Sequence, residues 1–229
     1  MTTKTERIEI RNSVFDQIGE MASALGSPER LKIIFQLVQS PKTVEDLSEL
    51  TCQNYASASQ HLQRLRKDGL VQVEKRGTSR IYSLTNQKIG LIFEIIQDLA
   101  HEVNPQLNQQ EDAIVDMSLY VATSLKEIVK KVEAQKALLI DVRAEVDFQF
   151  GSVEKAISVP LTRLGQFLSQ IKTNKELYIF CRGRYCGMAS DAVVLARKKG
   201  FVAYRLPQSA FRLQFQQRSK ENKTWISQS

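Results

Sequence analysis

The apolar residues change their spacing part-way along this chain of 229 residues, and this change limits the folds available to it. Before about residue 104, apolar residues recur every three or four positions, which predicts a series of helices, with one alternating stretch at 71–84 that predicts a β-hairpin. After about residue 118, short β-forming runs alternate with helical segments, which is typical of a mostly parallel sheet covered by helices. We therefore predict two domains, the first mainly α and the second α/β with a central parallel sheet.

The domain boundary is placed in a polar segment, 104–110, which contains Pro105 and has the composition of a linker. The predicted division is a first domain at 1–103, a linker at 104–118, a second domain at 119–218 and a tail at 219–229. Two interpretations of the segment 101–118 stay open: a flexible connection, or a helix that transmits a signal between the domains.

Composition and charge exclude several classes of protein. Hydrophobic residues make up 42% and charged residues 25%, which is ordinary globular composition. No apolar run approaches the roughly 18 residues that a membrane helix needs, and the N-terminus shows no secretory signal. The odd cysteine count of three argues against a disulfide scaffold, so we expect a cytoplasmic protein with no membrane contact. The net charge of +7 is compatible with an anionic partner.

The first domain has the order of a helix-turn-helix followed by a hairpin. A short helix near 44–50 and a turn precede a helix from Asn54 to about Lys67, which is suited to a major groove, and the basic hairpin tip suits the DNA backbone or minor groove. A solvated amphipathic helix beside a charged hairpin is the alternative. The predicted contacts to double-stranded operator DNA are Asn54, Tyr55, Ser57, Ser59, Gln60, His61, Arg64, Lys75, Arg76 and Arg80.

The helix near 89–103 carries more apolar surface than a small domain buries. Such a face predicts a partner, and a second copy of the chain is the expected one. The apolar residues concerned are Ile92, Ile95, Ile96 and Leu99, together with Val14, Phe15 and Ile18 near the N-terminus.

Residues 20–85 resemble the winged helix of the arsenic-repressor (ArsR) family. The residues that carry the resemblance are 24–31, 59–71, the Gly77 turn and Tyr82. The resemblance implies a homodimer built from the first and last helices and bound to a palindromic operator, usually as a repressor. Metal-sensing members carry a cysteine pair where this chain has 43–47 without cysteine, and Cys52 stands alone. We therefore expect no metal and no cofactor.

The second domain contains a loop, 181–187, rich in cysteine, arginine and glycine. It follows a predicted strand and precedes a predicted helix, so backbone N–H groups and the helix dipole point at one spot and form an anion cradle. A thiol there loses its proton easily, which makes Cys181 the candidate nucleophile; the alternative is a small buried hydrophobic residue. The catalytic set is Cys181, Arg182, Arg184 and Cys186, and the cradle is completed by Gly183, Tyr185 and Gly187.

The residue types around Cys181 exclude three chemistries. A cysteine phosphatase needs an arginine six positions after its cysteine, and that position is Gly187 here. A zinc site needs about four ligands, and Cys181 and Cys186 supply only two. A thioredoxin-type cysteine pair is absent. Sulfur transfer remains, in which Cys181 holds sulfane sulfur as a persulfide. Cys186 is either an inert helix-start residue or a resolving thiol.

Residues 119–218 resemble a rhodanese domain, on the landmarks 138–143, 156–161, the Cys181 loop and 200–201. The resemblance implies that Cys181 carries the persulfide and that Asp141 and Arg143 are structural ions supporting the loop. The second cysteine at the end of the loop resembles the variant found in fusions of a winged helix to a rhodanese domain. The sequence differs from the usual rhodanese motifs at 151–153, at 207–209 and at Leu213.

Three functions are therefore open. The first is a DNA-binding regulator, in the form of a repressor, whose rhodanese domain senses sulfane sulfur from a donor such as thiosulfate or polysulfide. The second is a working sulfurtransferase with an autoregulatory winged helix. The third is a repressor with a degenerate rhodanese domain used only for contacts.

Overall fold

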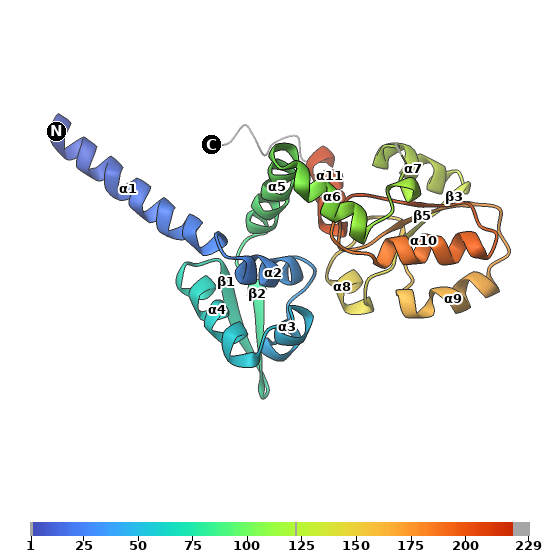
Figure 1. The fold of residues 1–229 in the computed structure, drawn as a ribbon, viewed down its shortest axis with the longest axis horizontal. Coiled ribbons are helices and arrows are strands. Elements are labelled where there is room, and N and C mark those ends of the chain that lie inside the picture. Colours follow the sequence, from blue (N-terminus) through green and yellow to red (C-terminus); the bar gives the residue numbers. More distant parts are fainter. Residues whose placement is uncertain (1, 122, 222–229) are drawn as a thin grey trace. The chain divides into compact units, whose positions relative to one another are not determined.

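The computed structural model describes residues 2–121 and 123–221 and divides into two compact units, Met1–Ile95 and Ile96–Ser229 (Figure 1). The two-domain prediction and both fold classes are confirmed. The division falls inside helix α5 (Gln87–Val103), whereas the sequence placed it after residue 103. The last two turns of α5 group with the second unit because Asp98 and His101 contact side chains there. Most of the predicted tail, 222–229, lies outside the described residues.

The first unit consists of helices around a β-hairpin, and local signals begin its helices. Ser27 and Asn54 cap α2 and α4 with their side chains, and Thr43 forms a capping box with Asp46 at α3. Gly77 has a φ of 61° in the hairpin turn, a conformation that glycine adopts without a Cβ penalty. The elements are α1 (Lys4–Leu25), α2 (Pro28–Leu37), α3 (Val44–Leu50), α4 (Tyr55–Lys67), β1 (Val71–Arg76), β2 (Ser79–Leu84) and the start of α5.

The core of the first unit lies where α2, α3 and α4 meet. Ile33, Ile34, Leu47, Leu62 and Leu65 are fully buried there. The tip of the β1–β2 hairpin extends beyond α3 and α4 (Figure 1). Residues that face away from the α2–α4 core at the hairpin tip and along α4 are therefore free to face a ligand.

The second unit is an α/β layer structure with, among the described residues, one sheet of four parallel strands in the order β4-β3-β5-β6. Its strands are β3 (Ala137–Asp141), β4 (Ala156–Ser158), β5 (Glu176–Phe180) and β6 (Ala203–Arg205). Its helices are α6 (Pro105–Ile114), the 3₁₀ turn η1 (Met117–Leu119), α7 (Leu125–Glu133), α8 (Glu145–Phe150), α9 (Leu161–Gln170), α10 (Met188–Lys198) and α11 (Ala210–Glu221).

Each face of this sheet has its own core. Leu164 and Leu168 of α9 pack with Ala192 of α10 on one face, and Ile128 of α7 packs with Leu213 of α11 on the other. The strands read as nearly continuous apolar runs because both faces are covered. The loop after β5 leaves the sheet at the carboxyl ends of the parallel strands, where α/β proteins place their sites.

Helix α6 occupies most of the segment that the sequence analysis described as a linker. The Asn104 side chain accepts from the N–H of Gln106, and Pro105 stands at the first helical position, so the polar residues that resembled a loop are helix-start signals. Within the described parts of the chain, no helix is long and apolar enough to cross a membrane.

Candidate functional site

The loop 181–187 brings two thiols together at the carboxyl end of β5. Cys181 directly follows the strand and is 1% exposed, and Cys186 stands two residues before α10 and is 9% exposed. The Cys181 thiol lies 3.5 Å from the carbonyl oxygen of Cys186, so the two ends of the loop are in contact. The structure thus pairs the two predicted loop cysteines, while Cys52 is exposed in the first unit.

The hydrogen bond between the thiols separates their acidities. The pKa of Cys186 falls from 9.0 to about 6, first because the Cys181 thiol donates to it, and then because the backbone N–H groups of Met188 and Arg182 point at it. The pKa of Cys181 is raised well above 9.0, because its thiol donates to Cys186 and because it is fully buried. The sequence predicted an easily ionised thiol at Cys181, and the backbone N–H groups of Met188 and Arg182 favour the thiolate of Cys186 as well.

Arg205 of β6 holds the loop from beneath. Its side chain is fully buried and donates to the carbonyl oxygens of Gly183 at 3.2 Å and Arg184 at 3.4 Å, and it also bonds Ser190 of α10. Its guanidinium lies over the ring of Tyr120 at 5.0 Å. Arg205 was not among the predicted site residues, although an arginine that ends a short, largely buried strand is a signal that could have drawn attention to it.

Gly183 fixes the course of the loop. Its φ is 110°, and a Cβ at this position would stand 2.9 Å from Cβ of Ser209. The loop is therefore closed against Ser209, one of the positions where the sequence departs from the rhodanese pattern. The N–H of Ala210 also donates to the carbonyl oxygen of Cys181 at 3.0 Å.

Both loop arginines are engaged by carboxylates. Arg182 Nη2 lies 3.3 Å from Oδ2 of the buried Asp147 of α8. Arg184 lies 3.1 Å from Glu111 of α6 and 3.7 Å from Asp98 of α5. The predicted attraction of an anionic donor therefore competes with these internal ion pairs.

The contacts of Arg184 belong to a wider cluster on α5 and α6. Asp98 also accepts a bidentate pair of hydrogen bonds from Arg212 of α11, and its pKa is lowered first by Arg212 and further by Arg184. The ring of Tyr185 stacks on that of His101, with centroids 5.8 Å apart. The helix-forming segment 96–114 thus touches two consecutive residues of the thiol loop.

The predicted structural ions, Asp141 and Arg143, form a buried bidentate pair at the end of β3. Arg143 Nη2 lies 2.7 Å from Asp141 Oδ2 and donates to the carbonyl oxygen of Gly151 at 2.8 Å. The Ser152 hydroxyl donates to Asp141 at 2.7 Å. The pair ties the end of β3 to residues 151–152, and the N–H of Val142 in turn donates to Phe180 O, next to Cys181.

The predicted DNA contacts on α4 are spread over its first three turns. Tyr55 and Gln60 are exposed, whereas Ser57, Ser59 and His61 are half-buried. The remaining two have intramolecular roles: Asn54 accepts the N–H of Ser57 at 2.8 Å and caps the helix, and Arg64 pairs with Asp68 at 2.8 Å.

On the hairpin, the three predicted basic residues are exposed near the tip. Lys75 and Arg80 are paired across the two strands, so they present positive charge together. Arg76 lies 2.9 Å from Glu74. This pair is solvent-exposed and contributes little to stability, so Arg76 can exchange Glu74 for a phosphate.

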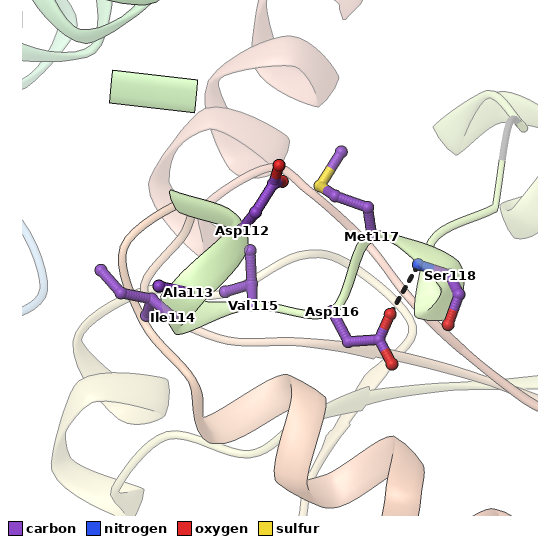
Figure 2. A pocket seen from close by; sticks show the side chains of 7 residues that line it. All are labelled: Asp112, Ala113, Ile114, Val115, Asp116, Met117 and Ser118. Atoms are coloured by element: carbon purple, nitrogen blue, oxygen red, sulfur yellow. Dashed lines mark hydrogen bonds between the residues drawn. The ribbon is translucent and has the colours of Figure 1, made fainter. Parts of the chain in front are cut away.

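A hollow of about 470 Å³ lies at the end of α6 (Figure 2). Seven residues line it, 112–118, and none belongs to the thiol loop. Its side chains include Met117 and the carboxylates of Asp112 and Asp116, of which Asp116 accepts the N–H of Ser118 at 2.9 Å. In residues 2–121 and 123–221, no group of three or more His, Cys, Asp or Glu side chains is placed to hold a metal ion.

Comparison with known proteins assigns both units. Residues 27–73 match the family described as "Bacterial regulatory protein, arsR family", and residues 123–209 match the rhodanese-like domain. The "HTH-type transcriptional regulator Rv0324" of Mycobacterium tuberculosis is 31% identical over 202 residues, which cover 85% of each chain. The chain belongs to the ArsR family. It is an ArsR-family transcriptional regulator with a rhodanese-like domain.

Other relatives of this ArsR-family regulator match its first unit. The "HTH-type transcriptional regulator YgaV" of Escherichia coli is 28% identical over 96 residues, which cover 42% of this chain and 96% of YgaV. A solved structure, the homodimeric winged helix-turn-helix DNA-binding domain Mb0332 of Mycobacterium bovis, is 29% identical with a TM-score of 0.42, covering 45% of this chain and 94% of that one.

The sequence analysis of this ArsR-family chain missed the residues that surround the thiol loop from outside it. Arg205, Asp98, Glu111, His101 and Asp147 lie 21 to 86 positions from the loop residues they touch, so no local pattern connects them with the loop.

Proposed function

We propose that this ArsR-family protein is a homodimeric, DNA-binding repressor whose rhodanese-like domain takes up sulfane sulfur on Cys181 as a persulfide. The observation that carries the proposal is the buried pair of Cys181 and Cys186 in the loop before α10, with the Cys181 thiol 3.5 Å from the Cys186 carbonyl oxygen. Two thiols that share one proton in a buried loop leave one sulfur ionised for attack while the other holds the proton.

The chemistry uses the pair as a unit. At neutral pH the two thiols hold one proton between them. The Cys181 sulfur forms an S–S bond to the sulfane sulfur of a donor such as thiosulfate or polysulfide, and the shared proton stays on Cys186. The S–S bond of the donor breaks, and sulfite or the shortened polysulfide leaves with the electron pair. The product is a Cys181 persulfide beside a neutral Cys186 thiol.

DNA binding and dimerisation are proposed for the first unit on its exposed side chains. Lys75 and Arg80 at the hairpin tip and Tyr55 and Gln60 on α4 are the exposed candidates for phosphates and base edges. Apolar residues are exposed along α1, where Phe15 is 65% exposed, and along α5. A second copy of the chain is the occupant that the ArsR resemblance implies for those faces.

The proposed test follows the intact mass of the reduced protein after exposure to thiosulfate or to polysulfide. Cys52→Ser serves as the background, because Cys52 is the exposed thiol outside the loop. A gain of about 32 Da that requires Cys181 supports the proposal. A gain that requires Cys186 and survives Cys181→Ser would show the persulfide forming on Cys186 instead, and no adduct in any variant would contradict sulfur uptake.

The regulatory part needs DNA as the readout. A duplex selected from a random pool by the reduced protein is titrated with reduced and sulfur-loaded protein. A change in affinity that disappears in Cys181→Ser supports a sensor, whereas turnover with thiosulfate and unchanged DNA affinity would favour a sulfurtransferase. The double variant Phe15→Glu with Ile95→Glu is expected to sediment as a monomer; a dimer would contradict the assignment of these faces.

A further inference from the structure

Helix α5 is the one element that both units share. Its first two turns belong to the first unit and residues 96–103 to the second. Asp98 and His101, on these last turns, contact Arg184 and Tyr185 of the thiol loop. A change in the loop therefore has a direct mechanical path to this helix.

The contacts form a compact cluster, which we call the clasp: Arg184 and Tyr185 from the loop, Asp98 and His101 from α5, and Glu111 from α6. Arg184 bridges Asp98 and Glu111, at 3.7 and 3.1 Å. His101 stacks on Tyr185 and places its Nε2 3.0 Å from Glu111. His101 and Glu111 are both buried, so the clasp is a packed arrangement.

We propose that the clasp transmits the state of the Cys181–Cys186 pair to α5: a covalent bridge between the two cysteines releases Arg184 and Tyr185 from Asp98, His101 and Glu111. The inference rests on the proposed function for the source of the bridge. It adds the route by which sulfur uptake reaches the helix that continues into the first unit.

The bridge forms from the persulfide without a further oxidant. The proton of the Cys186 thiol passes to the outer sulfur of the Cys181 persulfide, and the Cys186 sulfur attacks the inner sulfur held on Cys181. A bond forms between the two cysteine sulfurs, the bond to the outer sulfur breaks, and hydrosulfide leaves. The two cysteines are oxidised and the sulfane sulfur is reduced, so the electrons balance with the sulfane-sulfur donor as the oxidant.

The geometry of the loop explains why Arg184 and Tyr185 would lose their contacts in the clasp when the bridge forms. A disulfide holds its two sulfurs about 2 Å apart and requires a fixed torsion about the S–S bond. Only residues 182–185 separate the cysteines, and Arg205 pins the carbonyl oxygens of Gly183 and Arg184 from beneath. The rearrangement must then be taken up by the parts of Arg184 and Tyr185 that are not pinned, which are the side chains in the clasp.

Hydrogen exchange of the full chain tests this route. Diamide, a thiol oxidant, forms the bridge independently of any sulfur donor, seen as a loss of about 2 Da. We expect amides in 96–103 to exchange roughly three- to tenfold faster in the bridged protein, while α7, in the same unit, is unchanged. The combined Asp98→Asn and Glu111→Gln variant is expected to exchange at the fast rate before oxidation and to show no further change.

Two comparisons guard the interpretation. Glu176→Gln removes the Lys131–Glu176 ion pair elsewhere in the same unit and is expected to keep the wild-type response. Arg184→Gln removes the clasp from the loop side, should the double variant fail to fold. A bridged wild-type protein with unchanged exchange at 96–103, or a cysteine pair that diamide leaves reduced, would overturn the inference.

Sulfur uptake and transmission through the clasp can be rejected independently of each other. Faster exchange after diamide without any adduct from thiosulfate or polysulfide would keep the clasp and reject sulfur uptake. A Cys181 adduct without any change at 96–103, in protein that diamide does bridge, would keep sulfur uptake and reject the clasp.

Discussion

The acidity of Cys186 gives the sharpest prediction, because one neighbouring side chain is its first cause. The Cys181 thiol donates to Cys186, and this hydrogen bond is the largest influence that lowers the pKa of Cys186 from 9.0 to about 6. Cys181→Ala removes the donor and leaves a cavity of only one sulfur atom. We expect the pKa of Cys186 to rise toward its ordinary value, and its reactivity at neutral pH to fall.

The size of the effect follows from the ionised fraction. At pH 7 a thiol with a pKa of about 6 is roughly nine-tenths ionised, whereas one with a pKa of about 9 is ionised to about one part in a hundred. The pKa of Cys186 is depressed, so the thiolate is present above about pH 6 and disappears as the pH falls through that value. The variant is therefore expected to react at pH 7 several-fold to tens of times more slowly.

The assay is the rate of iodoacetamide alkylation at Cys186, followed by peptide mass against pH in the Cys52→Ser background. Arg182→Gln is the matched comparison, because the Arg182 charge is the smallest of the influences on Cys186. The Arg182→Gln variant should raise the pH midpoint of Cys186 alkylation less than Cys181→Ala does. A midpoint for unaltered Cys186 at or above about pH 8, or an unchanged midpoint in Cys181→Ala, would refute the reasoning.

Three further predictions concern stability. Asp141→Ala leaves the buried Arg143 without its carboxylate, so we expect the free energy of unfolding in urea to fall by about 3–5 kcal/mol, and a loss below about 1 kcal/mol would contradict the pairing. Gly183→Ala places a Cβ against Ser209 at a φ of 110°, and we expect a cost of about 1–3 kcal/mol and a raised Cys186 alkylation midpoint; unchanged stability and reactivity would contradict a closed loop. Asn54→Ala removes the cap of α4 and should cost about 1 kcal/mol in thermal unfolding, while Asn54→Asp should keep the cap; equal losses in both would show that capping is not its role.

The helix starts of this protein were readable from the sequence because their causes are local. Ser27 with Pro28, Thr43 with Asp46, and Ser124 with Glu127 all form the caps that their spacing indicates. The parallel sheet was readable for a similar reason, since strands buried on both faces leave short apolar runs between helices. The pairing of Cys181 with Cys186 follows from their position at the two ends of one short loop.

The surroundings of the loop were not readable, because they are assembled by tertiary packing. Asp98 and Glu111 lie 86 and 73 positions before Arg184, and a polar segment around Pro105 resembles a linker until its helix packs. The acidity of the two thiols could likewise not be predicted from the sequence. It depends on which sulfur receives the backbone N–H groups, and that is decided by the three-dimensional course of the loop.

The strength of the clasp sets a limit on what the proposed sensor can achieve. A partly exposed ion pair contributes at most about 1 kcal/mol, and a ring stack about 0.5–1.5 kcal/mol. The clasp of Arg184 and Tyr185 is then worth about 2 kcal/mol, which converts to roughly 30-fold in an affinity. A repressor released about 10⁴-fold needs about 5.5 kcal/mol, more than one loop supplies. Two loops in a homodimer would supply about 4 kcal/mol, close to a thousandfold. The second copy on the apolar faces of α1 and α5 is therefore what would turn a weak single-loop signal into a usable one, and DNA affinity should fall in two steps as the loops are bridged in turn; a single step of the full size at half loading would contradict this division.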